Sequence, residues 1–182
     1  MFIGENPSWA ENQEEPFSPN TISGKALDKH YLKPLGLTRD NVWITDIIKC
    51  RYPKEELLDI YHNKVKYNKE IQETTKNCCD LWLVTEVVHA RPHIIITLSD
   101  KEVYQRFRKL FNLQTPAKFA DAIGRPFKVE IAGYSTTLFP MIHPDISRPE
   151  GDGDSRKLKA RRKWFVLHEK EYIPNLKSYL PA

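Results

Sequence analysis

Short apolar runs that end in polar or turn-forming residues predict the strands of a buried sheet. The predicted strands cover residues 1–3, 42–48, 93–97, 127–133 and 135–142. The first three are continuous apolar runs, rich in β-branched side chains, with few polar residues among them. Runs of this kind are typical of strands that are covered on both faces.

In the segments between these runs, apolar residues recur at the spacing of a helix. The predicted helices cover residues 23–35, 69–89, 101–111 and about 155–179, the last interrupted at Pro174. In the first helix Leu27, Tyr31 and Leu35 fall on one stripe, and Gly36 follows as a stop signal. Strands that alternate with helices indicate an α/β fold with a mainly parallel sheet. We see no internal repeat and no linker, and we expect residues 1–182 to form one domain.

Polar side chains stand at the ends of the predicted strands. Asn6, Asp46, Ser99 and His143 all do so. The ends of parallel strands meet at one edge of a sheet, so we expect these residues to be neighbours in one pocket. Pro7 stiffens the backbone next to it, so Glu5 and Asn6 are aimed in a fixed direction.

Asp46 interrupts an otherwise apolar strand. A buried carboxylate without a partner is costly, so this side chain must be hydrogen-bonded, protonated or directed into a cleft.

The composition is that of an ordinary globular protein, with 182 residues, 40% hydrophobic and 29% charged. No apolar run is long enough for a membrane helix, and there is no secretion leader, so we expect an intracellular protein, cytoplasmic or nucleoid-associated. Lys and Arg number 28 against 24 Asp and Glu, and six of the basic residues lie in residues 156–163. That run, which includes Arg161 and Arg162, is either a phosphate-contacting face or a solvated start of a helix.

Three cysteines, Cys50, Cys78 and Cys79, are too few and too unevenly spaced for a disulfide framework. They are also one short of the four thiolates that hold an iron-sulfur cluster. From the residues alone we favour small buried thiols that pack as apolar side chains.

Several ordered motifs carry a resemblance to a known family. They are GENPSWAENQEEPF at 4–17, SGKALDK at 23–29, GLTRDNVWITDIIKCRYP at 36–53, RPHIIITLS at 91–99 and HPDIS at 143–147. In this order they resemble the uracil-DNA glycosylase superfamily, nearest to its iron-sulfur-containing branch, over residues 1 to about 148. The resemblance implies three layers, with a four-stranded parallel sheet between helices. It also implies removal of a damaged or deaminated base from DNA after the base has flipped out of the stack.

The same resemblance implies roles for individual residues. His143 matches the histidine that hydrogen-bonds the departing base, and Asn6 matches the position that orients water. Phe17 matches the aromatic residue that stacks on the flipped base, with Glu5 and Asp46 as further substrate-binding residues. Residues 145–148 match the loop that enters the duplex, with Ile146 as the apolar wedge. The DNA-binding set is completed by Ser8, Ser147, Arg148, Arg161 and Arg162.

Asp46 departs from the family pattern, which has Asn at the position that reads the base edge. An ionised carboxylate only accepts hydrogen bonds, so it opposes O4 of uracil and favours an amino group, as on cytosine. A protonated Asp46 would instead donate to uracil. Both alternatives are open from the sequence.

The cysteines form a second departure. Cys50 and one of Cys78 or Cys79 match two ligand positions of the iron-sulfur branch, whose other two ligands precede the first strand. This chain begins three residues before GEN, and we expect no cluster.

We therefore expect a DNA glycosylase, with DNA as its partner, no membrane association and a monomeric state. The alternative is a catalytically silent member that binds nucleic acid without cleaving it. A small-molecule nucleotide hydrolase is disfavoured, because no glycine-rich phosphate loop is present.

Overall fold

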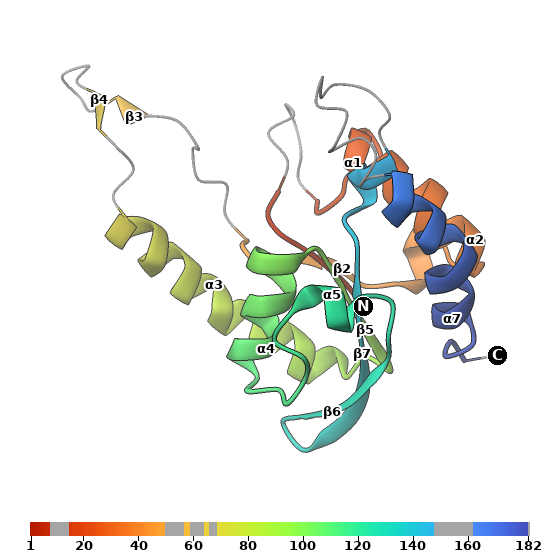
Figure 1. Ribbon diagram of the computed structural model, residues 1–182. Helices are drawn as coiled ribbons and strands as arrows, with labels where there is room; N and C mark the ends of the chain where they lie inside the picture. The colour runs from red at the N-terminus through yellow and green to blue at the C-terminus, as the bar shows by residue number, and fades with distance from the viewer. Residues whose placement is uncertain (8–14, 50–56, 59–63, 66–68, 148–161, 182) are drawn as a thin grey trace.

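The computed structural model describes residues 1–7, 15–49, 57–58, 64–65, 69–147 and 162–181. A central sheet runs through this part of the chain, with its strands in the order β2-β1-β5-β7-β6 (Figure 1). The bounds in that order are Ile44–Asp46, Phe2–Gly4, Ile94–Leu98, Tyr134–Met141 and Phe127–Ile131. The strands β2, β1, β5 and β7 run parallel to one another, and β6 runs antiparallel to β7.

The mainly parallel sheet is confirmed, and it has five strands where the resemblance implied four. The additional strand, β6, turns back through Ala132 and Gly133, which both have positive φ angles, 48° and 79°. This tight turn lets residues 127–131 pair with residues 134–138 in a hairpin. A second, separate hairpin is formed by β3 (Leu57–Leu58) and β4 (Lys64–Val65).

The predicted helices are present, with local changes of pitch. The first runs from α1 (Ile22–Leu27) through a π segment (Asp28–Leu32) to α2 (Lys33–Leu35). The next are α3 (Lys69–Ala90), a π segment (Asp100–Gln105) that leads into α4 (Arg106–Leu110), and the short α5 (Phe119–Ala122). The C-terminal helix comprises residues 162–167, a π segment (His168–Tyr172) and α7 (Ile173–Lys177). Short 3₁₀ turns cover Arg39–Asn41 and Pro144–Ser147. The sequence pattern did not predict α5.

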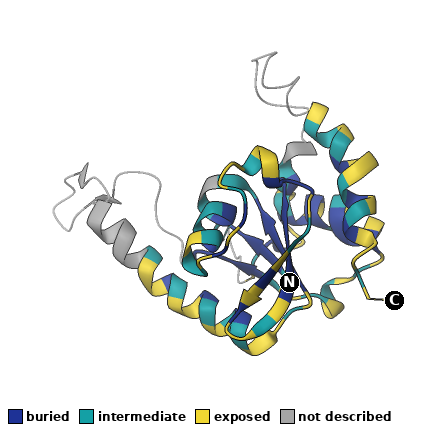
Figure 2. Cartoon of the chain, turned by 60° about the horizontal axis from the view of Figure 1, so that its bottom comes forward, coloured by how far each residue is buried: buried dark blue, intermediate teal, exposed yellow. Residues whose placement is uncertain are grey.

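The helices cover the sheet on both faces, as Figure 1 shows for α3 and α4 on one side and for α1, α2 and α7 on the other. Successive strand residues point to opposite faces, so Ile3 and Ile95 belong to the core on the α3 side. Phe2, Ile94 and Ile96 belong to the core on the α1 side. The strands β1, β2 and β5 and most of β7 are accordingly buried, whereas β6 alternates between buried and exposed residues and the outer helix faces are exposed (Figure 2). The three-layer α/β class is confirmed.

This topology gathers the strand ends that the sequence singled out. β1 ends at Gly4, directly before Glu5 and Asn6, and Gly4 pairs in register with Asp46 at the end of β2. His143 follows β7 by two residues, and the parallel direction of β1, β2 and β7 brings all three ends to one edge. Among the described helices, none combines the length and the apolar character needed to cross a membrane.

Candidate active site

Gly4 is the point at which two predicted site residues meet. A Cβ atom at Gly4 would lie 2.2 Å from the Phe17 ring and 2.4 Å from a carboxylate oxygen of Asp46. Both distances are far below van der Waals contact, so only glycine fits here. The sequence GEN therefore places Phe17 and Asp46 against one backbone position at the end of β1.

Asp46 is the most unusual group in this site. It is 1% exposed, and neither of its carboxylate oxygens has a hydrogen-bond partner among the described residues. Burial raises the pKa of Asp46 to about 7, with Lys49 opposing the shift and Glu5 and Glu86 adding to it. Near neutral pH the carboxyl group is therefore divided between its protonated and ionised forms. A buried polar group without a partner is able to bind a ligand that supplies the missing hydrogen bonds.

Phe17 connects Asp46 with His143. Its ring centroid lies 5.9 Å from that of His143, at an interplanar angle of 35°. Phe17 is largely buried, and its backbone is in the left-handed region, with φ of 51°. A non-glycine residue in this region is held there by its surroundings.

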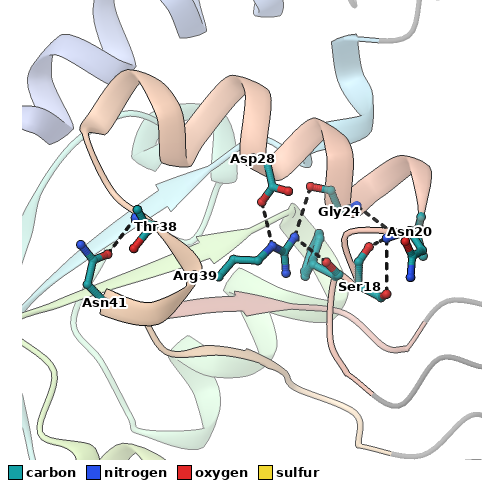
Figure 3. A network of polar contacts seen from close by, with 9 residues as sticks. Ser18, Asn20, Gly24, Asp28, Thr38, Arg39 and Asn41 are labelled. Atoms are coloured by element: carbon teal, nitrogen blue, oxygen red, sulfur yellow. Dashed lines mark hydrogen bonds and ion pairs between the residues drawn. The ribbon is translucent and has the colours of Figure 1, made fainter.

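Arg39 provides much of that support, and Figure 3 shows its contacts with Asp28 and Gly24. Its guanidinium donates to the carbonyl oxygen of Phe17 at 2.7 Å and to that of Gly24 at 3.4 Å. Its Nε donates to Asp28 at 2.9 Å, and Asp28 lies on the helix that begins at Ile22. The 3₁₀ turn that carries Arg39 thereby fixes the helix and the Phe17 backbone relative to each other. A side chain at Gly24 would collide with the carbonyl oxygens of Ser18 and Phe17, so these segments also touch directly.

Arg39→Ala is expected to lower the free energy of unfolding by about 1–2 kcal/mol, the range for charged hydrogen bonds at a partly exposed site. Urea denaturation measures this value. Arg39→Lys keeps the charge but lacks the forked geometry, so it should recover less than half of the loss. Equal stability of Arg39→Ala and the wild type would show that the network does not hold Phe17.

His143 is set in a defined tautomer by the turn that follows it. The backbone N–H of Asp145 donates to Nδ1 of His143 at 3.2 Å. Nδ1 therefore acts as an acceptor, and the neutral ring carries its proton on Nε2. The Asp145 carboxylate lies 4.0 Å from Nδ1 and would pair with a protonated ring. The arrangement makes Nε2–H a hydrogen-bond donor.

Glu5 and Asn6 follow Gly4 directly and are half-buried. The carboxamide Nδ2 of Asn6 donates to the carbonyl of Pro7 at 3.1 Å, and the Glu5 carbonyl accepts from the N–H of Ile48 at 2.9 Å. These bonds fix the backbone after β1 against the end of β2. Ser99 directly follows β5, and its N–H donates to the Met141 carbonyl at 3.0 Å, which aligns the ends of β5 and β7.

The predicted DNA-binding residues are described only in part. Ile146 and Ser147 belong to the 3₁₀ turn Pro144–Ser147, directly after His143, and their side chains are not described. Ser8, Arg148 and Arg161 lie outside the described residues. Arg162 is exposed at the first described position of the C-terminal helix. All of these assignments stay predictions.

Sequence reasoning missed Gly4 and Arg39, which shape the site without being reactive. It also missed a cluster of polar side chains near Asp46. In this cluster Lys49 Nζ contacts Glu86 and Thr45, each at 2.5 Å. The only signal for Arg39 was its place in the motif GLTRDN, and a motif does not say what a side chain touches.

The cysteines differ from one another. Cys79 is buried, as expected, and its Sγ accepts from the N–H of Lys49 at 3.2 Å. Cys78 is exposed, so the expectation of a buried thiol was wrong there, because adjacent helix residues face different directions. Cys50 lies outside the described residues. Within the described part of the chain no three Cys, His, Asp or Glu side chains are grouped to hold a metal, so these residues do not supply a four-thiolate site. That the chain has no cluster remains a prediction.

Comparison with known proteins places these motifs in context. A family model described as the uracil DNA glycosylase superfamily matches residues 1–162. The Type-4 uracil-DNA glycosylase of Saccharolobus solfataricus is 32% identical over 145 residues, which is 79% of this chain and 59% of that protein. The proteins of the same name from Sulfurisphaera tokodaii and Archaeoglobus fulgidus are 29% and 28% identical, over 79% of this chain and 58% and 64% of their own lengths. The chain thus spans less than two thirds of each of these curated relatives.

Proposed function

The chain belongs to the uracil-DNA glycosylase superfamily, and on this premise we propose that it hydrolyses the N-glycosidic bond of a deaminated or damaged base in DNA. The base, uracil or a related one, would be flipped out of the stack before cleavage. The observation that carries the proposal is the meeting of Phe17 and Asp46 on Gly4, with His143 beside the Phe17 ring. The proposal assigns these three residues the roles of stacking surface, reader of the base edge and hydrogen-bond donor.

His143 stabilises the departing base. As the glycosidic bond breaks, the bonding electrons move to the base, which becomes an anion, while the sugar becomes an oxocarbenium ion. The Nε2–H of His143 donates a hydrogen bond to the oxygen on which this charge develops. The Asp145 N–H keeps Nδ1 an acceptor, so the donor is in place before the reaction starts.

Phe17 and Asn6 act on the two sides of the breaking bond. The flipped base stacks on the Phe17 ring, an interaction worth about 1–3 kcal/mol. The Asn6 carboxamide orients the water that adds to the sugar carbon, and an amide is sufficient because an oxocarbenium ion needs little activation of its nucleophile. The water's proton then passes to solvent, and every step uses groups of the chain and water.

Asp46 chooses the base through its protonation state. A protonated carboxyl donates to O4 of uracil, whereas a carboxylate accepts from the amino group of a cytosine-like base. Because the pKa of Asp46 is raised to about 7, the donor form is well populated at neutral and lower pH. This supports uracil as a substrate under those conditions, and it favours the protonated alternative that the sequence left open.

DNA is the proposed partner, with Ser8 and Ser147 near the phosphates. The loop that ends at Arg148 enters the duplex, with Ile146 as its wedge. A DNA repair role would place the protein inside the cell, and we retain the prediction that it acts as a monomer.

The basic run at 156–163 should contribute to DNA affinity through counterion release. Each phosphate contact changes the slope of log affinity against log salt by about −0.7 to −0.9, so replacing Arg161 and Arg162 by alanine should flatten it by roughly 1.5. Fluorescence anisotropy at four salt concentrations measures the slope. Lys177 and Lys170, which are exposed on the same helix, provide a charge-matched control pair. An unchanged slope would assign the run to a solvated face.

A panel of oligonucleotides, each with one altered base, tests the proposed function. Cleavage by alkali after incubation reveals abasic sites, and we expect them at uracil below pH 7. Binding to every oligonucleotide without any abasic site would favour the silent nucleic-acid-binding alternative, which the replacement of the family's Asn by Asp46 also motivates. If the protein neither bound nor cleaved any of these oligonucleotides, both the glycosylase proposal and the silent-binder alternative would be contradicted.

A further inference from the structure

The C-terminal helix packs against the helix of residues 22–35 through buried apolar side chains and through one buried histidine, His168. This residue lies beyond position 162, where the family match ends. It is 1% exposed, and its Nε2 lies 2.9 Å from the carbonyl oxygen of His30. A carbonyl only accepts hydrogen bonds, so Nε2 carries the proton. Burial lowers the pKa of His168 to about 4, so the ring is neutral at physiological pH.

Pro34 explains why the His30 carbonyl takes a partner from another helix. In an α-helix the N–H four residues further on would donate to this carbonyl, and Pro34 has no N–H. The segment Asp28–Leu32, which contains His30 and ends two residues before Pro34, adopts the wider π pitch. His168 thus compensates for a bond that the proline removes.

Tyr31 extends this contact toward the active site. Its ring packs against His168 with centroids 4.5 Å apart, and it meets the edge of Phe2 at 6.1 Å. Its hydroxyl donates to the carbonyl oxygen of Ile142. Ile142 lies directly before His143 and one residue beyond the end of β7. Next to it, the Ser99 N–H donates to the carbonyl of Met141, the last residue of β7. Tyr31 therefore holds the peptide unit that leads into His143.

We propose that Tyr31, supported by His168 of the C-terminal helix, is a positioning residue for His143. It fixes the chain between the end of β7 and the turn that sets the imidazole, so that Nε2–H meets the departing base. The C-terminal helix is linked to the sheet through Gly124, whose carbonyl accepts from Asn175 Nδ2 at 2.9 Å and whose N–H donates to the carbonyl of Pro140 in β7 at 2.8 Å. The proposal rests on the proposed function for its effect on rate, but its structural content is independent of that function.

Tyr31→Phe tests it, because the change removes only the hydroxyl. The single-turnover rate should fall about tenfold with DNA affinity unchanged, as expected when a reacting group is displaced by less than an ångström. In a His143→Ala background the same change should alter the rate by less than about twofold, because the group it positions is gone. Tyr104→Phe is the matched control, since Tyr104 is also fully buried and donates to Thr115 at 3.0 Å in another part of the core.

A second readout separates this proposal from the proposed function. In ¹⁵N-histidine-labelled protein, Tyr31→Phe should shift the His143 ring resonances, and Tyr104→Phe should not, whether or not the wild type releases a base. His168→Phe keeps an aromatic ring against Tyr31 but removes the donor to His30, and it should shift the same resonances in the same direction. Unshifted His143 resonances in Tyr31→Phe, or an equal loss of rate with and without His143, would overturn the proposal.

Discussion

Replacing His143 by alanine is expected to lower the single-turnover rate of base release by roughly 10²–10³-fold while DNA affinity stays nearly intact, as for the loss of one donor to a developing anion. The reason is that the Nε2–H of His143 acts on charge that exists only as the bond breaks. Rates at saturating protein and anisotropy with the same oligonucleotide separate the two effects. His89→Ala, at an exposed histidine on α3, is the control and should retain the wild-type rate.

The opposite pattern would remove His143 from the chemistry. If His143→Ala weakened DNA binding but reached the wild-type rate at saturation, the histidine would serve binding alone. The tautomer set by Asp145 would then have no catalytic meaning.

Asp46→Asn is expected to change how uracil excision depends on pH. With a pKa of about 7, half of the wild-type carboxyl groups are protonated at pH 7 and about one in a hundred at pH 9, so wild-type activity on uracil should fall roughly 50-fold between these values. An Asn amide donates at every pH, so the variant should stay nearly flat and exceed the wild type at pH 9. Asp121→Asn, at an exposed residue of α5, should keep the wild-type profile.

The base preference should move together with the pH profile. Ionised Asp46 accepts from an amino group, so the wild type at high pH should favour amino-bearing bases relative to uracil, and Asp46→Asn should reverse this. An unchanged preference in the variant, with no pH dependence in the wild type, would show that Asp46 does not read the base.

The fold was predictable where the residue pattern is local. Apolar runs such as residues 93–97 identified the buried strands, and the stripe of Leu27, Tyr31 and Leu35 identified a helix that does face the core. The number of strands implied by the resemblance was one too low, because a hairpin turn as tight as Ala132–Gly133 lets a neighbouring run join the same sheet. The π segments were not predicted, since helical periodicity alone does not reveal a change of pitch.

The site was predictable as a set of strand ends but not as a geometry. Asp46 was recognisable as a buried carboxylate from its apolar neighbours, and the structure shows that it lies beside Phe17. Its missing hydrogen-bond partners and its shifted pKa depend on what surrounds it, which no local pattern contains. The same holds for Arg39 and Tyr31, whose partners Phe17 and Ile142 lie 22 and 111 residues away in the sequence.

The most direct test of the account is mass spectrometry of the products formed from an oligonucleotide with a single uracil at pH 6. The account predicts free uracil and an abasic strand in equal amounts with the wild type, and the same products at a rate lower by two to three orders of magnitude with His143→Ala. Uracil that remains attached to the DNA after prolonged incubation with the wild type, or equal release by both proteins, would contradict it.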